Sequence, residues 1–147
     1  MTNVVRSVLV LGVIGLAIGC GGASGDTAAT PPALTIDEGD GSTVSRLTLS
    51  ERAAERLGIA TAAVAMERVG GRDRPVIPYA ALLYDAEGAT WTYVNPEGLL
   101  FMRVPVTVEQ IVSGLAVLSD GPPAGTLVVT VGGAELYGAD QGVGGGH

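Results

Sequence analysis

Alternation of apolar and polar positions between residues 46 and 131 predicts a series of short β-strands. Turn-forming residues separate them at 85–88, 95–98 and 120–125. The expected strands are residues 46–49, 59–64, 77–84, 89–94, 100–108, a segment that begins at Ile111 or Leu115 and ends at Leu118, and 126–131. Short strands at this spacing predict a mainly β fold, a small antiparallel β-barrel or sandwich.

One short helix is expected between the first two strands. Ser50 stands where an N-cap belongs, residues 52–57 favour helix, and Gly58 ends it. Residues 67–74 are charged and contain glycine, which predicts a loop.

The strand at residues 100–108 is expected to have one buried side. Its apolar residues alternate with Arg103, Pro105 and Thr107, which would share the opposite, solvent-facing side. Pro105 has no amide donor, and this favours a sheet edge or a bulge.

The first residues have the pattern of an export signal. Arg6 precedes an apolar run at residues 8–18, which is too short for a spanning helix of ~20 residues. Small residues then lead to Cys20, the only cysteine, and resemble a bacterial lipobox, in which the thiol is alkylated by diacylglycerol and becomes residue one. An ordinary secretory signal with an incidental cysteine, or a permanent membrane anchor, are the alternatives. The lipobox predicts an extracytoplasmic, membrane-anchored lipoprotein, on the periplasmic face if the cell is a diderm.

Composition divides the chain into four parts. Residues 1–19 are the expected signal peptide, and 20–43, rich in small and polar residues, a flexible tether. Residues 44–139 form the β-rich domain, and 140–147 a disordered glycine-rich tail. The net charge is −7 with no lysine, so we expect no nucleic-acid partner.

Three segments resemble the C-terminal, membrane-proximal domain of periplasmic adaptor subunits (membrane fusion proteins) of RND-type tripartite efflux pumps. They are residues 76–88, 91–94 and 103–108. Residues 47–61 are similar to the opening strand, helix and strand of that family, and 125–138 to its final strand and turn. The resemblance implies a docking role beside an inner-membrane efflux permease or a full-length adaptor.

The same resemblance indicates a short form of the adaptor. The family separates its opening and closing strands by a long insert with a lipoyl-like domain and a helical hairpin, whereas only residues 67–74 join them here. A helix rises 1.5 Å per residue, so this chain is too short to bridge two membranes alone.

Catalytic chemistry has little basis in the sequence. The sole histidine, His147, ends a glycine-rich tail, and acidic pairs such as Asp37 with Glu38 fall in tether or turn positions. Met66, Met102 and His147 have no metal-ligand spacing. We therefore expect no enzyme activity, no catalytic or metal-binding residues and no cofactor.

Four side chains are candidate partner contacts. Trp91 and Tyr93 alternate on one strand face, where packing is the alternative, and Arg72 and Arg74 lie in a charged segment, where a solvated loop is the alternative. The expected function is a non-enzymatic, lipid-anchored accessory subunit that docks on a transporter. The alternative is a stand-alone envelope lipoprotein or a degenerate adaptor remnant that binds a ligand or an envelope partner.

Overall fold

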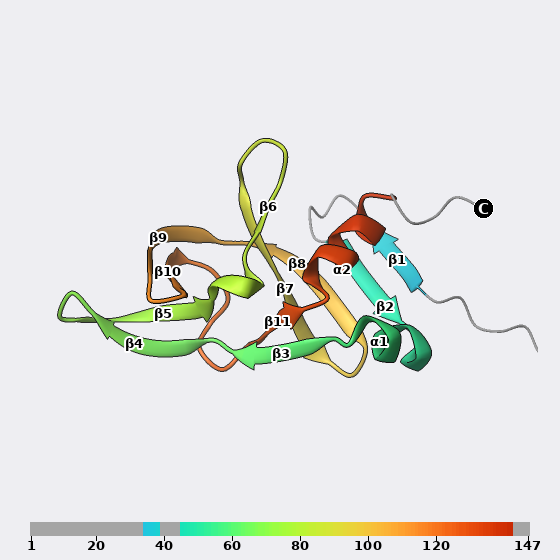
Figure 1. Ribbon diagram of the computed structural model, residues 1–147, viewed down its shortest axis with the longest axis horizontal. Coiled ribbons are helices and arrows are strands. Elements are labelled where there is room, and N and C mark those ends of the chain that lie inside the picture. Colours follow the sequence, from blue (N-terminus) through green and yellow to red (C-terminus); the bar gives the residue numbers. More distant parts are fainter. Residues whose placement is uncertain (1–33, 39–44, 143–147) are drawn as a thin grey trace, which may run out of the picture.

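The computed structural model describes residues 34–38 and 45–142, and these form two antiparallel sheets with two helices (Figure 1). The predicted signal peptide and Cys20 lie outside the described residues. The fold class predicted from the sequence is confirmed as mainly β. The sheets do not close into a barrel.

The larger sheet has the strand order β1-β2-β8-β7-β11-β3, and β6 pairs with β7 beside this path. Its strands are β1 (Leu34–Glu38), β2 (Ser45–Leu49), β3 (Ala60–Ala63), β6 (Leu83–Tyr84), β7 (Thr90–Glu97), β8 (Leu100–Pro105) and β11 (Leu127–Val131). The smaller sheet has the order β4-β5-β10-β9. Its strands are β4 (Ala65–Val69), β5 (Arg72–Pro78), β9 (Thr107–Val112) and β10 (Leu115–Asp120).

Two buried residues carry the chain from one sheet to the other. Val64 lies between β3 and β4, and Val106 lies between β8 and β9. Their backbone groups are hydrogen-bonded: Val64 N–H donates to the Thr126 carbonyl at 2.8 Å, and Val106 N–H to the Thr90 carbonyl at 3.0 Å. Both side chains belong to the core cluster that joins the two sheets. At these two corners the chain therefore passes from one sheet to the other without a connecting loop.

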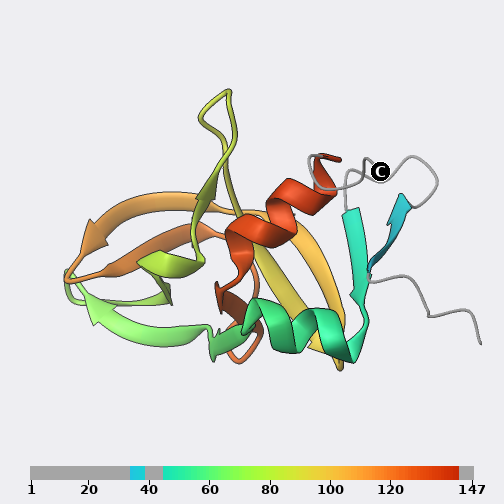
Figure 2. The same ribbon diagram turned by 45° about the vertical axis from the view of Figure 1, so that its right-hand side comes forward.

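The larger sheet is covered on both faces. One face packs on the cluster shared with the smaller sheet, which includes Val94 and Val128. The other face packs under α1 (Glu51–Leu57) and α2 (Gly133–Asp140), around Tyr93 and Phe101 (Figure 2). The expectation that residues 100–108 have only one buried side is wrong, because Phe101 is 2% exposed beneath the helices.

The predicted helix is confirmed with both caps. Ser50 Oγ accepts a hydrogen bond from Ala53 N–H at 3.3 Å, and Gly58 ends α1 in the left-handed conformation. The second helix, α2, covers residues that the sequence assigned to a final turn and a disordered tail. Asp140 in particular ends this helix.

Three further expectations are corrected. Residues 67–74 are not a loop but the centre of the β4–β5 hairpin, whose turn is Gly70 and Gly71, both with positive φ as a two-residue hairpin turn requires. The strand expected at 77–84 is broken by the 3₁₀ turn η1 (Tyr79–Ala81). Part of the predicted tether is strand β1, paired antiparallel with β2.

Thr92 and Thr90 offer a matched test of the core. The Thr92 hydroxyl is fully buried and has no hydrogen-bond partner among the described residues, whereas the Thr90 hydroxyl donates to the Val106 carbonyl at 2.6 Å. Thr92→Val should raise the free energy of unfolding by about 1 kcal/mol, because a methyl replaces an unpaired hydroxyl. Thr90→Val should lower it by about 1 kcal/mol. Urea denaturation measures both, and a Thr92→Val protein less stable than Thr90→Val would contradict this description of the core.

Candidate functional site: a groove beside a clamped tryptophan

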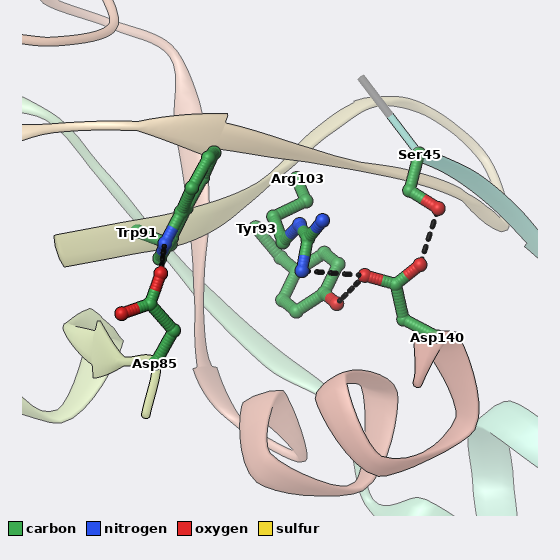
Figure 3. Close-up of polar contacts among 6 residues, drawn as sticks. All are labelled: Ser45, Asp85, Trp91, Tyr93, Arg103 and Asp140. Carbon is green, nitrogen blue, oxygen red and sulfur yellow. Dashed lines mark hydrogen bonds and ion pairs between the residues drawn. The ribbon is translucent and has the colours of Figure 1, made fainter. Parts of the chain in front are cut away.

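A buried carboxylate ties the C-terminal helix to the larger sheet (Figure 3). Asp140 in α2 accepts hydrogen bonds from the Ser45 hydroxyl and, at 3.0 Å, from the Tyr93 hydroxyl. It also forms an ion pair with Arg103 at 3.2 Å. The Asp140 side chain is 3% exposed, so these three partners replace its hydration.

Arg103 lies between aromatic rings from two elements. Its guanidinium carbon is 4.8 Å from the ring centroid of Trp91 in β7 and 5.8 Å from that of Tyr137 in α2. Both separations are within the range of cation–π attraction. The Arg103 Nε–H is buried and has no hydrogen-bond partner among the described residues, so its charge depends on Asp140 and the two rings.

Trp91 is held from its other end by the turn between β6 and β7. The indole Nε1–H donates to Asp85 Oδ2 at 2.9 Å, as the close-up in Figure 3 shows. Asp85 Oδ1 accepts from the backbone N–H groups of Glu87, at 3.1 Å, and Ala89, at 2.7 Å, which shapes the turn. The indole is therefore fixed by a hydrogen bond and by a stacked cation.

The surroundings of Asp85 and Tyr93 shift the pKa values of these two groups in opposite directions. The hydrogen bond from Trp91, with the backbone donors, lowers the pKa of Asp85 despite some desolvation. Burial, followed by the nearby Asp140 carboxylate, raises the pKa of Tyr93 well above its ordinary value. Tyr93 therefore stays protonated and donates its hydrogen bond to Asp140.

An open groove of about 510 Å³ lies where β9 diverges from the β6–β7 hairpin. Trp91 forms part of its wall, and Tyr84, which is 49% exposed, another. The lining residues are Tyr84, Ala89, Thr90, Trp91, Pro105, Val106, Thr107 and Val108. Most of these present apolar or aromatic surface, and the acidic turn that contains Glu87 connects two of the groove's walls.

The structure separates the four candidate contacts. Trp91 lines the groove, but Tyr93 is 1% exposed and belongs to the core, so the expectation that it contacts a partner is wrong. Arg72 lies at the exposed turn of the β4–β5 hairpin. Arg74 is paired with Glu109 in β9. These two arginines belong to the smaller sheet and line no part of the groove.

Arg103 and Asp140 were not among the candidate residues. The sequence placed Arg103 on a solvent-facing strand side and Asp140 in a disordered tail. One signal in the sequence could have indicated Arg103. It lies in the strand after the one that contains Trp91 and Tyr93, and it pairs with Tyr93 across β7 and β8, which places it near both aromatic rings.

Neither a metal centre nor a spanning helix occurs among the residues that the structure describes. No three acidic, histidine or cysteine side chains within 34–38 and 45–142 gather in a metal-binding arrangement. In the same ranges, no helix is long and apolar enough to cross a membrane.

Comparisons with known proteins found no relative. No protein-family model matches this chain, and neither the curated proteins nor the solved structures include a match.

Asp85 gives the site a pH dependence whose sign follows from its lowered pKa. The carboxylate–indole hydrogen bond stabilises the fold above the ordinary pKa of 3.8 and is lost as the pH falls through the lowered value. The emission of Trp91, the only tryptophan, should therefore change with a midpoint below 3.8.

An acid titration followed by fluorescence, with far-UV circular dichroism in parallel, measures this midpoint. Asp85→Asn should abolish the transition. A midpoint at or above 3.8, or an unchanged transition in Asp85→Asn, would contradict the assignment.

Proposed function

We propose that the chain is a non-enzymatic, lipid-anchored docking subunit that binds the extracytoplasmic part of a membrane export permease through the Trp91 groove. The proposal rests on a partly buried tryptophan in the groove wall that is already immobilised. Trp91 is fixed by Asp85 and Arg103 before any partner arrives. Aromatic side chains that lose little freedom on binding are the typical anchors of protein interfaces.

The position of the groove supports a transporter as the partner. Three segments resemble the membrane-proximal domain of efflux adaptors, and all three contribute to its lining: Tyr84 from the first, Trp91 from the second, and residues 105–108 from the third. Only Ala89 and Thr90 come from outside these segments. A docking surface made from them is what an adaptor-like role requires.

The chemistry of the groove limits what it binds. Its lining is largely apolar and aromatic, and the neighbouring turn carries Asp85 and Glu87. Asp85 is engaged by Trp91 and backbone donors, whereas Glu87 is exposed. The complementary occupant is an extended apolar segment that carries a basic side chain, from an extracytoplasmic loop of the permease.

The expected lipid on Cys20 would keep this small surface beside its partner. A groove of this size offers a modest contact area, and confinement to a membrane raises the effective concentration of both proteins. Two or three acyl chains on one cysteine make such attachment stable.

Site-specific photo-crosslinking in native cells tests the proposal. A benzophenone side chain at position 84 should crosslink to an export permease or to a full-length adaptor of its pump. The control places the same group at Val131, which is 51% exposed but does not line the groove. Equal yields from both positions, or products that contain no transport protein, would overturn the proposal in favour of a stand-alone envelope lipoprotein.

Trp91→Ala should reduce the affinity for that permease by about 30-fold, since a central tryptophan anchor contributes about 2 kcal/mol or more. Leu127→Ala, an exposed apolar residue of β11 that does not line the groove, should leave affinity unchanged. Circular dichroism first verifies the fold of each variant. Its affinity is then measured for the permease that photo-crosslinking identified, purified in detergent. A loss of less than twofold for Trp91→Ala would count against the groove.

A further inference from the structure

Asp140 occupies a place that local helix energetics disfavour. It is the last residue of α2, where the partial negative charge of the helix end repels a carboxylate, and the last turn contains no basic residue. A carboxylate at this position is explained by its tertiary contacts, chiefly Arg103.

The contacts of Asp140 lead to the groove in two steps. Asp140 pairs with Arg103, and Arg103 stacks on Trp91, which forms the groove wall. Figure 3 shows Arg103 between Trp91 and Asp140. Tyr137, one turn before Asp140, stacks on the same guanidinium. Two residues of α2 therefore hold the cation that supports the indole.

We propose that Arg103 and Asp140 are positioning residues for the Trp91 groove, so that the C-terminal helix sets the orientation of the surface that the partner binds. Binding of a partner at the groove rests on the proposed function, whereas the positioning of Trp91 does not. Neither residue lines the groove: Asp140 acts through Arg103, and Arg103 acts through Trp91.

The seating of α2 and the occupation of the groove are therefore coupled in both directions. If the seated position of α2 favours the indole orientation that binds the partner, then occupation of the groove favours the seated helix by the same free energy. Ser45, at the start of β2, donates to the same Asp140 carboxylate, so the start of β2 and the end of α2 meet at one point.

Trp91 supplies its own reporter, because its emission is not mixed with that of another tryptophan. Asp140→Asn removes the charge that holds Arg103 while keeping the size of the side chain. Acrylamide should then quench Trp91 more strongly than in the parent protein, although the substituted residue is two steps away. Arg103→Lys, which keeps the charge but loses the planar stack, should have the same effect.

Two control variants separate positioning from a general loss of stability. Ser45→Ala removes a different partner of Asp140 and should leave quenching unchanged. Val76→Ala truncates a buried residue of β5 that belongs to neither core cluster and does not line the groove, so it lowers stability and should leave the quenching of Trp91 unchanged under native conditions. Quenching that is unaffected by Asp140→Asn, or equally increased by Val76→Ala, would overturn the proposal.

The partner assay adds a functional readout. Asp140→Asn and Arg103→Lys should each lower the affinity for the permease that photo-crosslinking identified by about two- to fivefold, as expected for the loss of one cation–π contact. If the quenching changes but no permease is ever crosslinked, the proposed function fails and the positioning role stands. If the permease binds Asp140→Asn with full affinity, the positioning role fails and the docking role stands.

Discussion

The ion pair between Arg103 and Asp140 constrains the rest of this structure. Arg103 is 18% exposed and Asp140 3%, so neither charge keeps its full hydration and each requires the other. The pair lies on the face of the larger sheet that α1 and α2 cover. Because Arg103 comes from β8 and Asp140 from α2, satisfying the pair seats the C-terminal helix on the sheet.

The same pair connects the core to the surface. Tyr93, a neighbour of Arg103 across β7 and β8, is buried and donates to Asp140, whereas Trp91, two residues earlier, reaches the groove. Alternate residues of one strand thus serve the interior and the partner surface. The sequence grouped these two aromatic residues as equivalent candidates, and the chain corner at Val106 explains why they differ. At Val106 the chain leaves β8 for the smaller sheet, and this divergence opens the groove beside Trp91.

Local patterns predicted the parts of the fold that local chemistry determines. Ser50 and Gly58 bound the first helix as their capping preferences require, and the turn at Asp85 appears where it was expected. The β4–β5 hairpin was missed because residues 67–74, the part around its turn, are mostly exposed and charged, which is also typical of a loop. The Gly70–Gly71 turn was the signal for a hairpin. Arg103 and Asp140 were missed because their partners are distant in sequence, and composition alone makes a glycine-rich end look unstructured. A buried network of this kind follows from topology, which no single segment encodes.

A double-mutant cycle between Arg103→Met and Asp140→Asn, followed by urea denaturation, measures whether this ion pair holds α2 on the sheet. We expect the two changes to be coupled by about 1–3 kcal/mol, because either single change leaves a buried polar group without its partner and the second change removes that penalty. Additive losses, within about 0.5 kcal/mol, would contradict it, since they would mean that the two residues act independently and that α2 is seated by apolar packing alone.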